Sequence, residues 1–141
     1  SSKKPNTLWY GFDSFEGLKE DWAGTDYQAS YFNLSKKPKL NSNIEPVVGD
    51  VQDTLDNFTT KYSPKINFMH MDMDTYESTR YVLDKLKSSL VPGAIIIFDE
   101  LYNFPGWEYG EYKALKEVFQ DNEYIFLAFN LKGGQAVIQI L

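Results

Sequence analysis

The sequence contains no cysteine, only one histidine and no apolar run long enough to span a membrane. Without cysteine it can form neither a disulfide scaffold nor a reactive thiolate, which fits a reducing compartment. Positive charge is also scarce: 14 Lys and Arg residues stand against 20 Asp and Glu, for a net charge of -6. Nucleic acids and anionic membranes need a basic surface, so neither is expected as a partner. The first residues lack the apolar core of a signal peptide, and we expect a cytoplasmic protein.

Two apolar runs in the middle of the chain each end in a pair of acids. The first run leads into Asp72 and Asp74, and the second, residues 94–98, leads into Asp99 and Glu100. Strands that are apolar on both faces belong inside a parallel sheet, whose ligand chemistry lies beyond the carboxyl ends of the strands. We therefore expect the four carboxyl groups to meet at one edge. Their mutual repulsion there favours a bound proton or a hard cation such as Mg²⁺ or Ca²⁺.

Acids are also common wherever a strand reaches the surface, and this simpler explanation stays open for each acid taken singly. The repetition of the pattern on two strands favours a functional role for Asp72 and Asp99 in a metal-assisted active site. For Asp74 and Glu100, a functional role and an ordinary place at the surface explain the pattern equally well.

Stretches typical of strands alternate with stretches typical of helices. We expect strands at residues 7–13, 45–48, 66–72, 94–99, 124–130 and 135–141, and helices at 51–62, at 75–90 and after the aromatic loop 101–110. Residues 14–43 form a polar excursion that has room for a short helix. The alternation predicts one α/β domain over residues 1–141, with a mainly parallel sheet that ends in an antiparallel hairpin. At 141 residues and 43% hydrophobic composition, the chain can build one core.

Three segments resemble the macrocin O-methyltransferase family. They are Gly11–Leu18 (GFDSFEGL), His70–Thr79 (HMDMDTYEST) and Pro92–Glu100 (PGAIIIFDE), and they occur in the family's order. Members are class I, Rossmann-like methyltransferases that use S-adenosylmethionine and a divalent metal to methylate hydroxyl groups, typically on sugars of natural products. The resemblance implies an O-methyltransferase that acts on a hydroxyl of a sugar or another small molecule, with S-adenosylmethionine and Mg²⁺ as cofactors.

A more distant similarity to catechol O-methyltransferase implies roles for individual residues. Asp13 matches the acid that holds the ribose hydroxyls of the cofactor. The turn at residues 48–53 matches the one that lines the adenine, with Val51 and Gln52 as its contacts. Glu100 stands where that relative has an asparagine, which adds a charge to the metal site. The residues implied in cofactor binding are Asp13, Gly49, Asp50, Val51 and Gln52, and those implied in metal binding are Asp72, Asp99 and Glu100.

The acceptor hydroxyl needs a base to take its proton. Asp74 and His70 are the candidates, because both flank the implied metal ligand Asp72. The lysine that serves catechol O-methyltransferase has no counterpart that we can place. A histidine packed in a strand, with its ring nitrogens satisfied, is an equally good account of His70.

The first strand of the family, with an acid and a glycine-rich turn of the form Glu-x-Gly-x-x-x-Gly, has no match before Trp9. In the usual order this strand lies between the strands that end at Asp13 and Asp72. Its absence predicts two unpaired sheet edges, which would pair with each other or with a second copy in a homodimer. The alternative function is therefore a catalytically inactive methyltransferase fragment or remnant that acts as a folding or oligomerisation module.

Overall fold

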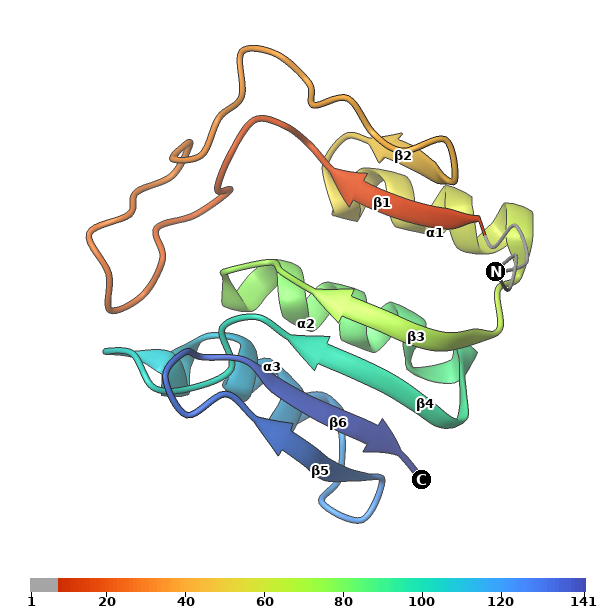
Figure 1. The fold of residues 1–141 in the computed structure, drawn as a ribbon, viewed down its shortest axis with the longest axis vertical. Helices are drawn as coiled ribbons and strands as arrows, with labels where there is room; N and C mark the ends of the chain where they lie inside the picture. Colours follow the sequence, from red (N-terminus) through yellow and green to blue (C-terminus); the bar gives the residue numbers. More distant parts are fainter. Residues whose placement is uncertain (1–7) are drawn as a thin grey trace, which may run out of the picture.

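A four-stranded sheet forms the centre of the protein. In the computed structural model, which describes residues 8–141, the strands lie in the order β3 (Ile66–Met71), β4 (Leu90–Phe98), β6 (Ala136–Ile140) and β5 (Tyr124–Phe129) (Figure 1). β3 and β4 are parallel, whereas β6 is antiparallel to both β4 and β5. The predicted α/β class and the closing antiparallel hairpin are confirmed.

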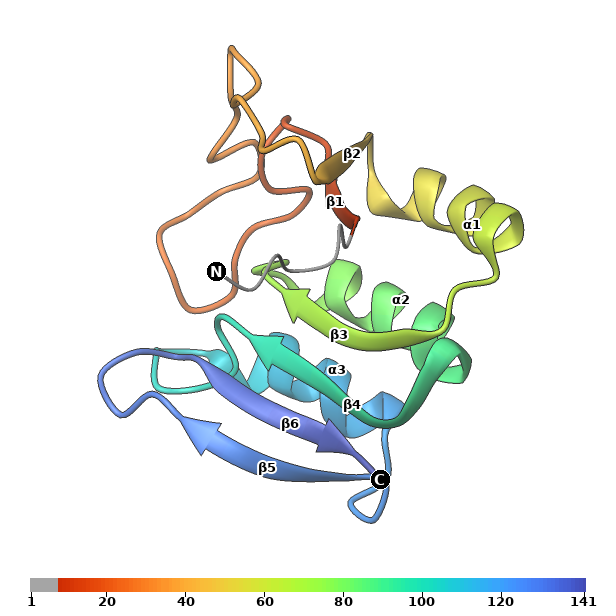
Figure 2. The same cartoon turned by 45° about the vertical axis from the view of Figure 1, so that its right-hand side comes forward.

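Three helices, α1 (Val51–Tyr62), α2 (Tyr76–Leu86) and α3 (Glu111–Val118), lie on one side of the strands (Figures 1 and 2). Leu83 of α2 and Ile96 of β4 are fully buried in the core that the helices form with the sheet. Because side chains alternate along a strand, the residues between the buried ones project from the opposite face, which carries no helix within residues 8–141. None of the helices in this range has both the length and the apolar character that crossing a membrane requires.

The start of β4 differs from the prediction. The sequence predicts a helix to residue 90 and a strand from residue 94, but α2 ends at Leu86 and β4 begins at Leu90. Lys87–Ser89 tighten into a 3-10 turn, η1, which lets Leu90 pair with Ile66 of β3. The ladder is irregular after this pair, and Gly93 in that stretch adopts a φ of +84°, which glycine tolerates.

The other predicted elements begin and end within two residues of their observed positions. The predicted start of the first strand at residue 7 lies outside the described residues. The polar excursion at residues 14–43 consists of turns and irregular chain and contains no helix. A second 3-10 turn, η2 (Trp107–Tyr109), lies in the aromatic loop before α3.

The remaining strands form a separate pair. β1 (Trp9–Asp13) runs parallel to β2 (Ile44–Val48) and does not pair with β3. The prediction that the edges of β1 and β3 pair directly is therefore wrong. The reason is that β1 is anchored on α1: the rings of Tyr10 and Phe12 pack edge to face against Phe58, at centroid distances of 4.8 and 5.1 Å.

The helix that carries β1 is itself fixed to α2. The Tyr81 hydroxyl donates to the Gln52 carbonyl at 3.1 Å, and Lys85 forms an ion pair with Asp56 at 2.8 Å. These contacts hold β1 apart from β3, and a cavity of about 1300 Å³ lies between the two strands. Pairing of the free edges with a second copy stays a prediction.

Candidate active site

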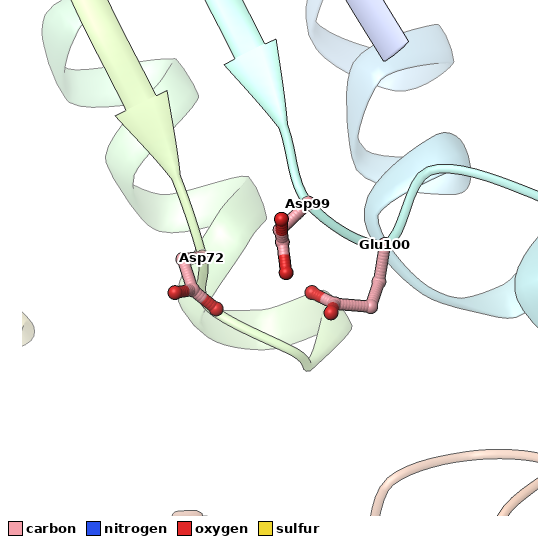
Figure 3. A group of neighbouring side chains, drawn as sticks. All are labelled: Asp72, Asp99 and Glu100. Atoms are coloured by element: carbon pink, nitrogen blue, oxygen red, sulfur yellow. The ribbon is translucent and has the colours of Figure 1, made fainter. Parts of the chain in front are cut away.

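Three of the four acids predicted to meet at the sheet edge form one cluster. β3 and β4 are parallel with Met71 opposite Phe98, so Asp72 and Asp99 follow at the same end of neighbouring strands. The Asp99 amide donates to the Met71 carbonyl at 3.0 Å, which keeps the two segments paired as far as the acids. Figure 3 shows the side chains of Asp72, Asp99 and Glu100 gathered at this point, and one oxygen of each lies within 4.8 Å of the others.

The cluster concentrates negative charge in a partly buried place. Burial, together with the hydrogen bond and charge of Asp99, raises the pKa of Glu100 to about 9. Burial and then the charge of Asp99 also raise the pKa of Asp72 above its ordinary value. Oε2 of Glu100 is buried without any hydrogen-bond partner in the described part of the chain. A divalent cation would supply that partner and offset the charge, so these oxygen donors fit a hard metal ion.

The two candidate bases lie beside the cluster. Asp74 is half-buried, and burial together with the charges of Asp72 and Asp99 raises its pKa to about 6. The side chain of His70 is 50% exposed, and its Nε2 lies 4.0 Å from Oδ1 of Asp99. His70 is thus not a packed strand histidine, and both groups are accessible from the cavity that they line.

Two further side chains contact the cluster and were not predicted. Gln135, just before β6, donates from Nε2 to Oδ1 of Asp99 at 3.1 Å. Glu111, in the first turn of α3, is fully buried and accepts hydrogen bonds from the backbone of Met73 and Glu100. Both are distant in sequence from the acids that they contact, and no motif marks them. Only the pairing of β6 with β4 and the packing of α3 beside the sheet bring them to the site.

The cavity between β1 and β3 extends from the acid cluster to the end of β1. Asp72, Asp74 and Glu100 line it on one side, and Asp13 lines it on the other. The charge of Asp13 contributes to the raised pKa of Asp72, after the larger effects of burial and Asp99. At about 1300 Å³ the cavity exceeds the roughly 300–1,000 Å³ of common ligand sites. This volume includes the gap between the unpaired edges of β1 and β3, so it is larger than a ligand site alone would need.

The turn after β2 forms another part of the cavity wall. The Gly49 amide donates to the Asp13 carbonyl at 3.1 Å, which aligns this turn with the end of β1. Asp50 caps α1 by accepting from the Gln52 amide at 2.8 Å, and it forms an ion pair with Lys19 at 2.9 Å. The side chain of Gln52 accepts from Lys19 at 3.0 Å and does not line the cavity. The residues on the wall from the predicted cofactor set are Asp13, Gly49, Asp50 and Val51.

Two loops cover the carboxyl ends of the strands. Gly24 of the excursion and Gly106 of the aromatic loop pack backbone to backbone, and a Cβ on Gly24 would lie 1.8 Å from the Pro105 carbonyl oxygen. Next to this contact, Trp22 packs edge to face against Phe104 at a centroid distance of 5.8 Å. Trp22 lines the cavity, and its indole N–H is buried without an acceptor within residues 8–141. The two loops thus contact each other beside the cavity, and Trp22 presents one hydrogen-bond donor to it.

The metal-free protein should be less stable at pH 8 than at pH 5. Folding raises the pKa values of Asp74, Glu100 and Glu111 to about 6, 9 and 8, chiefly because burial disfavours the charged forms. From pH ~4 up to these values, the folded chain holds protons that the unfolded chain has released, so the free energy of unfolding falls as the pH rises. Urea unfolding in EDTA measures the difference. Equal or greater stability at pH 8 would contradict this prediction. Saturating Mg²⁺, in place of EDTA, should make the difference between the two pH values smaller.

An α/β sheet with an acid cluster at its strand ends, beside a cavity between β1 and β3, is typical of a ligand-binding α/β domain. The family described as a methyltransferase domain matches residues 3–101. The chain belongs to this methyltransferase-domain family.

Solved structures with the same fold include those of other methyltransferases. The crystal structure of CalS11, a calicheamicin methyltransferase, matches with a TM-score of 0.79 at 22% identity, over 97% of this chain and 62% of that one. The apo structure of CalS11, titled a TDP-rhamnose 3'-O-methyltransferase, matches with a TM-score of 0.60 at 27% identity, over 71% of this chain and 43% of that one. The O-methyltransferase NovP matches with a TM-score of 0.65 at 19% identity, over 94% and 60%.

The chain spans less than two thirds of the length of these matched proteins. At 22% and 19% identity, the CalS11 crystal structure and NovP establish the fold and nothing finer. Comparison with curated protein sequences gave no match.

Proposed function

We propose that this chain forms the core of an S-adenosylmethionine-dependent, metal-assisted O-methyltransferase of the macrocin type, which acts on a hydroxyl of a sugar or another small molecule. The observation that carries the proposal is the cluster of Asp72, Asp99 and Glu100 beside a cavity that Asp13 lines on its other side. Membership of a methyltransferase-domain family supports the type of reaction, and the O-methyltransferase titles of CalS11 and NovP support a hydroxyl as the acceptor.

The metal site would consist of one carboxylate oxygen from each of Asp72, Asp99 and Glu100. Mg²⁺ held by such ligands lowers the pKa of a hydroxyl and orients its oxygen. Asp74 and His70, two residues after and before Asp72 in sequence, both line the cavity, and each is a candidate to accept the proton that the hydroxyl loses.

The cofactor would lie across the cavity, with its ribose at Asp13 and its adenine at the turn that begins at Gly49. S-adenosylmethionine supplies an activated methyl group on a sulfonium. The chain would hold the acceptor oxygen and the methyl group in the geometry for transfer. Holding reacting atoms near attack distance can lower the activation barrier of a reaction by about 7–11 kcal/mol. The unpaired indole N–H of Trp22 offers a donor for a polar ligand in the same cavity.

Titration calorimetry with S-adenosylmethionine and Mg²⁺ tests this proposal. We expect cofactor binding at micromolar concentration. We expect Asp13→Ala to weaken it with little change in Mg²⁺ binding, because Asp13 is not a member of the cluster of Asp72, Asp99 and Glu100. Absence of cofactor binding up to millimolar concentration, for a folded protein, would overturn the proposal.

A second candidate function is an inactive domain that pairs with another copy through its free sheet edges. The supporting observation is that Trp9 and Phe68, on β1 and β3, meet edge to face at 5.4 Å and still remain 44% and 38% exposed. Pairing of these edges would cover both rings. A dimer in sedimentation that Phe68→Lys dissociates, together with no cofactor binding, would favour this module. A monomer that binds S-adenosylmethionine would exclude it.

A further inference from the structure

We propose that Glu111 is a positioning residue that sets the spacing of the metal ligands from the helix side of the sheet. This inference rests on the metal site of the proposed function. Glu111 lies in the first turn of α3, has no exposed surface and does not line the cavity. It is therefore not itself placed to bind the metal or the acceptor. Its carboxylate instead contacts the backbone of both segments that carry the ligands.

The contacts tie the end of β3 to the end of β4. Oε1 of Glu111 accepts from the Met73 amide at 3.3 Å and from the Thr79 hydroxyl at 3.5 Å. Oε2 accepts from the Glu100 amide at 3.4 Å. Met73 directly follows Asp72, and Glu100 is itself a member of the cluster. One buried carboxylate therefore bridges the two segments whose side chains would hold one ion.

A carboxyl group suits this place because its two oxygens keep acceptor capacity with or without a proton, one oxygen for each segment. The amides of Met73 and Glu100 lie beyond the last paired residues of β3 and β4, Met71 and Phe98, where the ladder offers them no partner. Glutamine would keep one acceptor and turn an NH₂ group toward the other amide, and alanine would leave both amides without this partner. Outer groups that orient metal ligands commonly contribute 10- to 100-fold to metal affinity.

Mn²⁺ titration followed by electron paramagnetic resonance tests this role in the full chain. We expect Glu111→Ala to weaken Mn²⁺ binding by about 10- to 100-fold, and Glu111→Gln to weaken it by less. Glu117→Gln is the matched control: it removes one negative charge from the same helix, at an exposed site paired with Arg80, and should leave Mn²⁺ binding unchanged. Deuterium exchange of the Met73 and Glu100 amides should be slow in the wild type and faster in both Glu111 variants.

The outcomes separate this role from the metal site itself. Wild-type protein that binds Mn²⁺, with folded Glu111 variants that bind it equally well, would overturn the role of Glu111 alone. Wild-type protein that binds no Mn²⁺ would overturn the metal site and this role together. If neither variant folds, deuterium exchange in the wild type decides. Slow exchange of the Met73 and Glu100 amides supports their hydrogen bonds to Glu111. Exchange as fast as that of exposed amides overturns the role of Glu111.

Discussion

Replacing Asp72 with alanine should weaken Mn²⁺ or Mg²⁺ binding by at least about 100-fold, because losing a direct ligand costs more than losing a group that merely orients one. The protein should stay folded. Burial and the charge of Asp99 already disfavour the ionised form of Asp72, so removing this carboxylate relieves repulsion. Mn²⁺ titration measures the affinity, and circular dichroism with urea unfolding measures the fold.

Asp84→Ala is the control for this experiment, because it removes an exposed acid from α2 and leaves the cluster intact. It should bind Mn²⁺ as the wild type does. A folded Asp72→Ala variant with unchanged affinity would show that the metal, if bound, lies elsewhere. An Asp72→Ala variant that fails to fold would show that Asp72 is structural.

The 141-residue chain, assayed alone with S-adenosylmethionine and Mg²⁺, should show no methyl transfer above background. The edges of β1 and β3 are unpaired within the described residues, and the cavity between them is open. Within residues 8–141 no strand lies between β1 and β3 to carry the expected glycine-rich turn at which the methionine part of the cofactor would rest. Binding through Asp13 and the turn at Gly49, without turnover, is the expected behaviour.

Transfer of a radiolabelled methyl group to sugar nucleotides and simple polyols measures this directly, against a control without protein. Turnover on any acceptor would show that the site is complete in this chain and would contradict the prediction. In that case Asp74→Asn, which keeps the size of the side chain and removes its basicity, would identify whether the described site is responsible.

Local patterns explain why much of the fold could be predicted. Val51 and Leu55 stand at helical spacing, and the helix that begins at Val51 has the predicted bounds. Apolar strands that end in acids predicted that Asp72 and Asp99 would lie at one edge, because parallel neighbours in register end together. Each of these predictions depends on a short segment and on the geometry that all sheets and helices share.

The features that were missed depend on contacts between distant segments. The place of β1 follows from the attachment of α1 to α2, in which Tyr81 bonds to a residue 29 positions away, and no local pattern encodes that distance. The bond from Met73 to Glu111 spans 38 positions. In sequence, Glu111 is one acid among 20 and stands in the first turn of a helix, where an acid is ordinary. Its burial is visible only in the packed molecule.

The most direct test of the central claim is the anomalous X-ray scattering of a crystal of this chain soaked in Mn²⁺. The account predicts one strong peak among the carboxylate oxygens of Asp72, Asp99 and Glu100, at roughly 2.0–2.6 Å from at least one oxygen of each, the range for hard cations. A well-ordered site with no peak between these residues, or with the ion bound elsewhere on the chain, would contradict it.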